Sequence, residues 1–255
     1  MSVLLDIKGV VKQFGGLRAL NGVSLQVQEG EIRGLIGPNA SGKTTLINCI
    51  AGTQRVDRGE IAFGGQRIDS LQPNHIAATG IMRTFQIAKV FRDMTILENV
   101  MIPALADGQG IAKARRRGEE LLQFALLSNL RDEPARNLSG GQAMLLQIIR
   151  GFMHHGLRLY LMDEPFAGVH DAIKGVILKT IYTMNQEKRI TFLIVSHEMT
   201  TVKSICQQVS VLDKGEVISE GTLEEVASDP VVIDSYLGGQ DNADVSIGTG
   251  HLRLR

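Results

Sequence analysis

The 255-residue sequence lacks tryptophan, has only two cysteines, and carries 27 basic and 27 acidic residues, so its formal net charge is zero. Without a basic excess, nucleic acid and anionic membrane surfaces are not expected partners unless a local patch attracts them. Cys49 and Cys206 have neither metal-ligand spacing nor a disulfide framework, which is typical of a reducing compartment.

Long apolar runs are also missing, and none approaches the ~18 residues that a bilayer span needs. The first segment is interrupted by Asp6 and Lys8 and is a poor signal peptide. Hydrophobic residues make up 44% and charged residues 21%, which is ordinary for a globular protein. We therefore expect a cytosolic protein that can still dock on a membrane complex.

Apolar stretches of strand length alternate with longer helical stretches, which predicts a mainly parallel sheet with helices on its faces. The expected strands are 31–37, 157–164 and 190–197, and a helix at 43–52 follows the first of them. Residues 3–27 and 60–68 break this pattern and resemble short antiparallel strands. Gly64-Gly65 and residues 213–215 are suited to tight hairpin turns, because glycine tolerates positive φ.

The segment from about 87 to 153 contains few strand signals and is predicted to be a helical subdomain inserted into the α/β core. One of its helices should begin at Thr95, where Glu98 can complete a capping box. The tail at 239–255 is rich in glycine, aspartate and asparagine, and we expect it to be loosely ordered. The main domain is therefore predicted to span 1–238.

The stretch GPNASGKT fits the pattern G-x-x-x-x-G-K-[ST] and stands between an expected strand and an expected helix, the context of a phosphate-binding loop. Its glycines let backbone N–H groups converge on phosphate oxygens, and Lys43 brings a positive charge to the β- and γ-phosphates. The Thr44 hydroxyl can ligate Mg²⁺. The candidate ATP-binding residues here are Gly37, Pro38, Asn39, Ala40, Ser41, Gly42, Lys43, Thr44 and Thr45.

Asp163 and Glu164 end an apolar strand, and a parallel neighbour of strand 31–36 would place both beside the phosphate loop. Asp163 would then complete the Mg²⁺ shell, and Glu164 would polarise a water for attack on the γ-phosphate. His197 ends another apolar strand and reaches the same edge of the sheet. Four other histidines, His75, His154, His155 and His251, show no metal-ligand spacing, and we expect them at the surface.

These motifs together resemble the ATP-binding subunit of an ABC (ATP-binding cassette) transporter. The chain also contains the family's signature LSGGQ at 138–142, and "FAGVHD" at 166–171 matches its D-loop. The resemblance implies an α/β P-loop NTPase (ABC ATPase) core with an antiparallel β subdomain and an inserted helical subdomain. It also implies that Gln86, Glu164 and His197 are catalytic residues and that Gln86 binds the metal as well. Phe14 is implied to stack on adenine.

The signature implies a second phosphate-binding surface that works across a dimer. In this family two cassettes pair head to tail, so Ser139, Gly140, Gly141 and Gln142 would bind ATP held by the partner chain. ATP and Mg²⁺ are the implied cofactors. The implied partners are a second ABC ATPase chain, two membrane permease subunits and, indirectly, a substrate-binding protein. The resemblance also implies that the chain is cytoplasmic and peripheral on the inner face of the membrane, and that it binds no nucleic acid. "KVFRDM" at 89–94 is a plausible docking patch for the permeases.

Finer features are similar to the ATPase of branched-chain amino acid importers, notably "RTFQIAKVFRDMTILENV" and "EEVASDPVVIDSYLGG". A urea or amide importer ATPase remains an alternative. A soluble non-transport ABC ATPase acting on nucleic acid or the ribosome is a second one, but the chain has one cassette and no heptad repeats.

Three departures from the family pattern stand out. Ala40 occupies a position where positive φ would cost an alanine roughly 1 kcal/mol. Apolar residues Ala143-Met144-Leu145 follow the signature where a polar turn is usual, and His170 replaces an acidic or amide residue in the D-loop. We expect ATP binding to survive these changes, whereas coupling across the dimer is less certain at His170.

Overall fold

The structure is a computed structural model that describes residues 2–237. A six-stranded sheet forms its centre in the order β10-β9-β3-β8-β7-β6. Its strands are β3 (Ile32–Ile36), β6 (Ile81–Arg83), β7 (Leu159–Asp163), β8 (Thr191–Val195), β9 (Gln208–Asp213) and β10 (Glu216–Gly221). All neighbours are parallel except β9 and β10, so the mainly parallel sheet is confirmed. The tail at 239–255 lies outside the described residues.

One detail of the predicted sheet is wrong. Strand β7, which carries Asp163, is not a direct neighbour of β3, because β8 lies between them. Since all three strands run parallel, their carboxyl ends still meet at one edge. The phosphate loop and the acidic pair therefore share that edge although their strands do not touch.

A second, four-stranded antiparallel sheet packs over one side of the core in the order β2-β1-β4-β5. Its strands are β1 (Val3–Phe14), β2 (Leu17–Gln28), β4 (Arg58–Phe63) and β5 (Gln66–Arg67). Both residues of the predicted Gly64-Gly65 turn have positive φ, at 55° and 80°. The turn between β9 and β10 has the same character at Lys214 and Gly215, so both predicted hairpins are confirmed.

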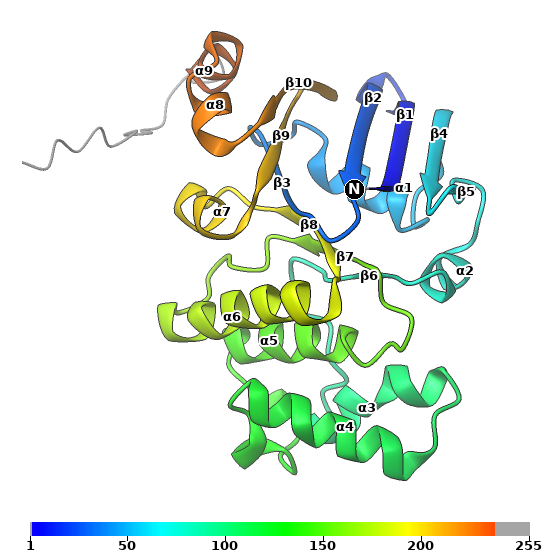
Figure 1. Cartoon of the computed structure of the whole chain (residues 1–255), viewed down its shortest axis with the longest axis vertical. Coiled ribbons are helices and arrows are strands. Elements are labelled where there is room, and N and C mark those ends of the chain that lie inside the picture. The colour runs from blue at the N-terminus through cyan, green and yellow to red at the C-terminus, as the bar shows by residue number, and fades with distance from the viewer. Residues whose placement is uncertain (1, 238–255) are drawn as a thin grey trace, which may run out of the picture.

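The region predicted to be helical forms the far end of the molecule from β10 and α9 (Figure 1). It contains α3 (Ile96–Ala106), α4 (Ile111–Phe124), the short 3-10 helices η1 (Ser128–Leu130) and η2 (Ala135–Asn137), and α5 (Gly140–Gly151). The capping box at the start of α3 is present: Thr95 N–H donates to Glu98 at 2.8 Å, and Glu98 N–H donates to the Thr95 hydroxyl at 3.1 Å.

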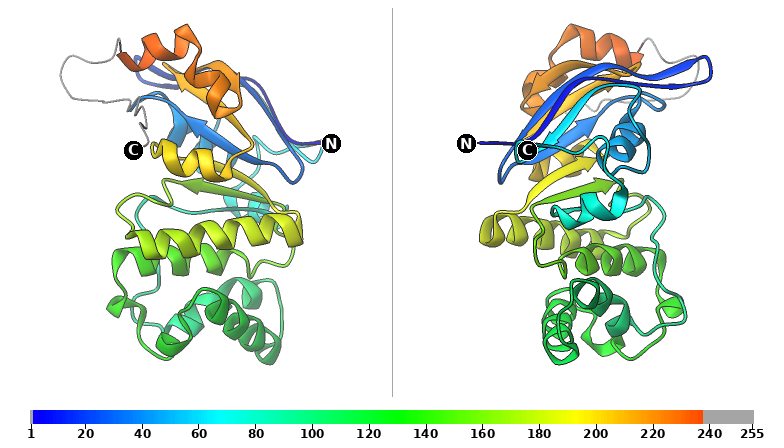
Figure 2. Two further views of the ribbon diagram at one scale, coloured as in Figure 1. Left: turned by 60° about the vertical axis from the view of Figure 1, so that its left-hand side comes forward. Right: turned by 90° about the vertical axis from the view of Figure 1, so that its right-hand side faces the viewer.

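The remaining helices are α1 (Lys43–Ile50), α2 (Pro73–Ala78), α6 (Asp171–Lys188), α7 (Met199–Ile205), α8 (Leu223–Ala227) and α9 (Pro230–Leu237). Helices α5 and α6 run side by side, between the sheet on one side and helices α3 and α4 on the other, in every view (Figure 1, Figure 2). None of the helices in the described region combines the length and apolar character that a bilayer span requires.

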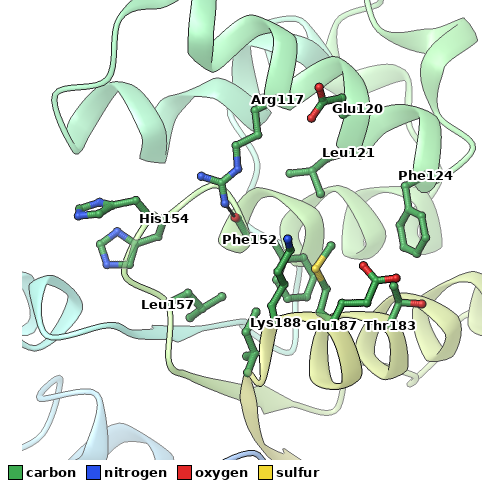
Figure 3. Close-up of a pocket in the computed structure, with 13 residues that line it drawn as sticks. Arg117, Glu120, Leu121, Phe124, Phe152, His154, Leu157, Thr183, Glu187 and Lys188 are labelled. Atoms are coloured by element: carbon green, nitrogen blue, oxygen red, sulfur yellow. Dashed lines mark hydrogen bonds between the residues drawn. The ribbon is translucent and has the colours of Figure 1, made fainter.

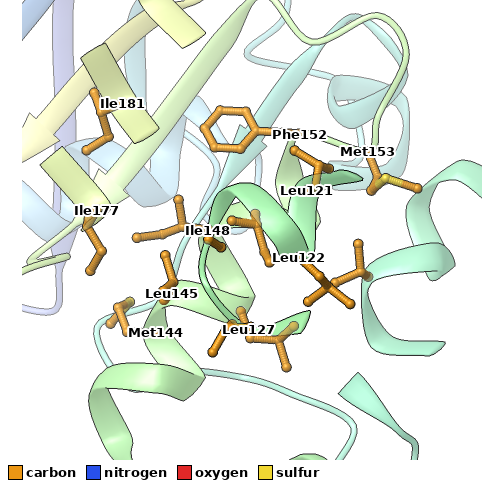
Figure 4. Close-up of a cluster of buried hydrophobic side chains, with 14 of the residues drawn as sticks. Leu121, Leu122, Leu127, Met144, Leu145, Ile148, Phe152, Met153, Ile177 and Ile181 are labelled. Carbon is orange, nitrogen blue, oxygen red and sulfur yellow. The ribbon is translucent and has the colours of Figure 1, made fainter. Parts of the chain in front are cut away.

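Helix α5 joins the helical end to the sheet through a shared apolar core. Its residues Met144, Leu145 and Ile148 are buried in one cluster with Leu122 of α4 and Ile177 of α6 (Figure 4). The same cluster includes inward-facing residues of β7 and β8. Two of the apolar residues that depart from the family pattern after the signature, Met144 and Leu145, therefore lie in the chain's own core, at 3% and 2% exposure.

Candidate functional site

The phosphate loop connects β3 to α1 and owes its curvature to two glycines without room for a side chain. A Cβ on Gly37 would lie 1.9 Å from the Leu212 carbonyl oxygen, and one on Gly42 would lie 2.5 Å from the Ala19 carbonyl oxygen. Both glycines have positive φ. Between them Ala40 has φ 62°, the left-handed conformation that costs an alanine about 1 kcal/mol. The strain anticipated at this position is therefore present, and the loop keeps its curled form.

Lys43 starts α1 and turns back into the loop. Its Nζ donates to the carbonyl oxygens of Gly37 at 2.9 Å and Pro38 at 2.7 Å. Burial lowers the pKa of Lys43, while the negative charges of Glu164 and Asp163 act in the opposite direction. The ammonium group is thus partly desolvated and directed to the place where a phosphate would enter.

Asp163 lies at the end of β7 and is almost fully buried, at 2% exposure. Its N–H donates to the Thr84 hydroxyl at 3.1 Å, which holds the strand end against β6. The Thr44 hydroxyl approaches the Asp163 carboxylate at 3.4 Å. Burial raises the pKa of Asp163 despite the charges of Arg83 and Lys43. This buried carboxylate beside a hydroxyl fits Mg²⁺, because both are hard oxygen ligands and the cation would offset the cost of burial.

Glu164 follows in a strained turn with φ 50° and is 9% exposed. Its N–H donates to Val195 at the end of β8 at 2.9 Å. Its carboxylate oxygen lies 2.9 Å from Nδ1 of His197 and 3.4 Å from the His197 N–H. Two neighbouring strand ends therefore hold this carboxylate in place, and His197, whose side chain is largely exposed, contacts it directly.

A pocket of about 540 Å³ brings most of the predicted site together. Its lining includes Phe14, the loop from Asn39 to Thr45, Gln86, Asp163 and Glu164. Arg18 and Lys214 also line the pocket, and the sequence analysis did not identify them. Arg18 is four residues after Phe14 in the same hairpin, and Lys214 is in the predicted turn at 213–215. The sequence therefore indicates the element that carries each residue, but it does not show that the two residues line one pocket.

The signature residues do not join this pocket. Of the residues that the structure describes, its lining includes none of Ser139, Gly140, Gly141 and Gln142, and it does not include His197. Ser139 instead caps α5: its hydroxyl accepts from Gln142 N–H at 3.3 Å, and the Gln142 side chain accepts from Ser139 N–H at 2.9 Å. The N-terminus of α5 is thus formed and suited to bind an anion. It does not line the pocket of the chain's own phosphate loop, so a phosphate bound in that pocket would not reach it through this lining.

The histidine pair at 154–155 lies beside a second pocket of about 640 Å³ between α4, α6 and the loop after α5 (Figure 3). The prediction that both are surface residues is wrong for His154, whose side chain is only 8% exposed. Its Nδ1 lies 2.8–2.9 Å from both oxygens of Asp107, and His155 Nδ1 lies 3.1 Å from one of them. His75 is exposed as predicted, and His251 lies outside the described residues.

These three side chains could hold a metal by composition, but the environment of His154 opposes it. Burial acts to raise the pKa of Asp107, but hydrogen bonds from His155 and His154 lower it by more. The pKa of Asp107 is therefore lowered overall, and its carboxylate is stabilised as a hydrogen-bond acceptor. Within the described residues, His154 Nε2 is buried without a hydrogen-bond partner. Metal binding through Nδ1 would put a proton on that nitrogen with no acceptor, whereas metal-bound histidines normally donate from it. The cluster instead links the loop after α5 to Asp107 at the end of α3.

Comparison with known proteins agrees with the resemblance to ABC transporter ATP-binding subunits. The family model described as ABC transporter matches residues 20–167, and one described as branched-chain amino acid ATP-binding cassette transporter matches 216–242. The chain is 38% identical to the "probable branched-chain amino acid transport ATP-binding protein" of Archaeoglobus fulgidus, covering 94% of this chain and 97% of that one. It is 34% identical to the high-affinity branched-chain amino acid transport ATP-binding protein of Pseudomonas aeruginosa, covering 92% and 98%.

Solved structures show the same likeness in three dimensions. A nucleotide-free ATP-binding cassette from an ABC transporter matches with a TM-score of 0.82 at 34% identity, covering 92% of this chain and 99% of that one. The ADP conformation of an ATP-binding cassette matches with a TM-score of 0.82 at 35% identity, covering 93% and 100%. A dimeric cassette in a post-hydrolysis state, bound to ADP and Pi, matches with a TM-score of 0.79 at 26% identity, covering 86% and 99%.

Proposed function

Since the chain belongs to the family of ABC transporter ATP-binding proteins, we propose that it powers an importer of branched-chain amino acids by hydrolysing ATP. The observation that carries the ATPase assignment is the pocket in which the phosphate loop, Gln86, Asp163 and Glu164 converge. No single stretch of the chain provides these groups. Their convergence at the carboxyl edge of the sheet is the arrangement that open α/β sheets use for ligands.

In the proposed complex the phosphate loop wraps the triphosphate. Its backbone N–H groups and Lys43 bind the β- and γ-phosphates, and Phe14, 44% exposed at the pocket rim, stacks on the adenine. Thr44, Asp163 and Gln86 would hold Mg²⁺, which neutralises phosphate charge when bound. The approach of the Thr44 hydroxyl to the Asp163 carboxylate supports this set.

Glu164 is proposed as the base. It accepts a proton from the water that attacks the γ-phosphorus, as the bond from that phosphorus to the ADP oxygen breaks. The contact between Glu164 and His197 at 2.9 Å supports a positioning role for the histidine, because it restricts the carboxylate to one orientation. Gln86 lines the same pocket and can orient the water or the metal.

The composite site is proposed to form when two cassettes meet head to tail. Ser139 and the N–H groups of Gly140 and Gly141 would then bind the γ-phosphate held by the partner chain. Three observations support this: the separation of the signature from the chain's own pocket, the formed N-terminus of α5, and the dimeric state of similar cassettes. Loss of the γ-phosphate would remove the cross-chain contacts and open the dimer.

The membrane partners are proposed to be two permease subunits, with the chain peripheral on the inner face of the membrane and a substrate-binding protein acting from the other side. Ile87 at 82% and Phe91 at 51% exposure present apolar groups in the segment that follows Gln86, as a docking surface requires. Exposed apolar side chains of this size are unfavourable in water, so a partner that covers them would gain free energy.

The cargo is proposed to be branched-chain amino acids because the relatives carry that function in their names and the matching C-terminal family model does too. Urea or short amides are the alternative cargo. The test is uptake into proteoliposomes that contain this chain together with two permeases and the binding protein of a branched-chain amino acid importer. We expect ATP-dependent uptake of radiolabelled leucine and none of urea. Urea uptake without leucine uptake would transfer the assignment to the alternative.

A further inference from the structure

Gln147 on α5 is a buried amide that no role described above uses. It is 2% exposed. Its Nε2 donates to the Phe85 carbonyl oxygen at 3.0 Å, and its Oε1 accepts from the Lys89 N–H at 3.0 Å. One side chain thus bonds the residues on both sides of the segment 86–88, which begins with Gln86.

The chain is attached to a different part of the molecule one residue earlier. Thr84 N–H donates to the Leu161 carbonyl at 2.9 Å, and the Thr84 hydroxyl accepts from Asp163 N–H at 3.1 Å. Thr84 is therefore fixed to β7 in the sheet, whereas Phe85 is fixed to α5. The attachment changes at the peptide bond between residues 84 and 85.

Further contacts hold the following residues to the helical end. Arg150, three residues after Gln147 on α5, donates to the Lys89 carbonyl at 2.7 Å. Asn99 of α3, fully buried, accepts from Phe91 N–H at 2.8 Å and donates to the Phe91 carbonyl at 2.9 Å. The segment from Phe85 to Phe91 is thus held by side chains of two helices.

Helix α5 begins directly after Ser139, so it connects the signature to Gln147 over eight residues, a rise of about 12 Å. An α-helix packed in a core transmits displacement with little bending. We propose that Gln147 is a positioning residue that fixes Gln86 to the signature helix. Gln86 and Ser139 then move as one unit when the composite site closes, while Thr84 and Asp163 stay with the sheet. This rests on the proposed catalytic role of Gln86.

The chemistry of an amide explains why the Gln147 side chain can hold the segment 86–88 to α5. Only a side chain with a donor and an acceptor can bond a carbonyl and an N–H of the same loop at once. An apolar replacement would leave Phe85 C=O and Lys89 N–H to water, and the segment 86–88 would lose both of these attachments. Misplacement of a reacting group by about 1 Å can cost roughly a hundredfold in rate.

The test compares Gln147→Leu with Asn185→Leu. Asn185 is the matched control, because its buried amide also bonds two carbonyls, Gly30 at 2.8 Å and Ile190 at 2.9 Å, but it lies in α6 away from the Gln86 segment. Hydrogen exchange is followed at the Lys89 amide in the full-length chain without nucleotide. ATP binding and turnover are then measured on the same samples.

In Gln147→Leu we expect Lys89 exchange to rise at least about tenfold and turnover to fall at least about tenfold, with the ATP dissociation constant within about twofold. Asn185→Leu should change neither Lys89 exchange nor turnover by more than about twofold. Unchanged Lys89 exchange in Gln147→Leu overturns the proposal, and so does faster exchange with turnover equal to that of Asn185→Leu. If Gln147→Leu does not fold, Gln147→Met, which keeps an unbranched side chain, is judged by the same two criteria.

The two proposals fail separately in this design. An unmodified chain without ATP turnover would refute the proposed function. Unaltered exchange at Lys89 would refute the role of Gln147 alone, because that measurement needs no nucleotide and no partner.

Discussion

Replacing Glu164 by glutamine is the sharpest test of the assigned chemistry. The carboxylate is 9% exposed and lies 2.9 Å from His197 Nδ1, and an amide of the same size fits that space. The change removes the proton acceptor and leaves the phosphate loop untouched. A general base contributes about 10²- to 10⁴-fold. The activation free energy of hydrolysis should therefore rise by about 3–5 kcal/mol.

Phosphate release at saturating ATP measures this loss, and filter binding should give an ATP dissociation constant within about twofold of the unmodified chain. ATP should also hold the variant as a dimer on a sizing column. Glu198→Gln is the matched control, because that carboxylate is one residue from His197 but accepts from Lys174 at 2.7 Å and Thr201 at 3.0 Å. Its turnover should stay within about twofold. A Glu164→Gln variant that keeps more than about a tenth of normal turnover would refute the assignment.

Three other substitutions test separate parts of the argument. Lys43→Ala should weaken ATP binding at least about tenfold in a filter assay, since charged hydrogen bonds contribute about 1.5–3 kcal/mol, and unchanged affinity would contradict the loop's role. Ser139→Arg should leave ATP binding to one chain intact but prevent ATP-driven pairing; normal pairing by light scattering would count against the shared site. Gly151→Ala places Cβ 2.2 Å from the Tyr160 hydroxyl and should lower the unfolding free energy by about 1–3 kcal/mol, whereas Gly175→Ala meets nothing within 4 Å and should raise it by up to about 1 kcal/mol. Equal shifts of the two midpoints in urea would show that the steric reason is wrong.

Features that depend on neighbouring residues could be predicted from the sequence. The turn at Gly64-Gly65, the capping box at Thr95 and the strand–loop–helix around Lys43 all arise from local backbone preferences. The strand order could not be derived in the same way. The position of β8 between β3 and β7 is decided by how crossover helices pack on the sheet, which no short stretch encodes.

The site shows the same division. The phosphate loop and the acidic pair could be proposed from the sequence because each motif is continuous along the chain. The burial of His154 was missed because its partner Asp107 comes 47 residues earlier, at the end of α3. Arg18 and Lys214 were missed for a related reason, since only the packing of the two sheets brings Arg18 on β2 and the turn at Lys214 to the same pocket.

The electrostatics of the pocket support a binding role for Asp163 and Lys43 rather than a role in stabilising the fold. Burial raises the pKa of Asp163 above its value in the unfolded chain, so ionised Asp163 opposes folding increasingly as the pH rises through that interval. Burial also lowers the pKa of Lys43, so protonated Lys43 opposes folding at every pH below its folded pKa.

Wherever Asp163 is ionised and Lys43 is protonated, each charge therefore comes at a cost to stability. Positions that serve only the fold would be more stable with apolar side chains. A triphosphate would supply negative charge to Lys43, and a divalent cation would supply positive charge to Asp163, so the proposed binding would offset both costs at once. Because the charged groups are already desolvated and oriented before a ligand arrives, the free energy that their desolvation takes from folding would be recovered as affinity for a nucleotide and its metal.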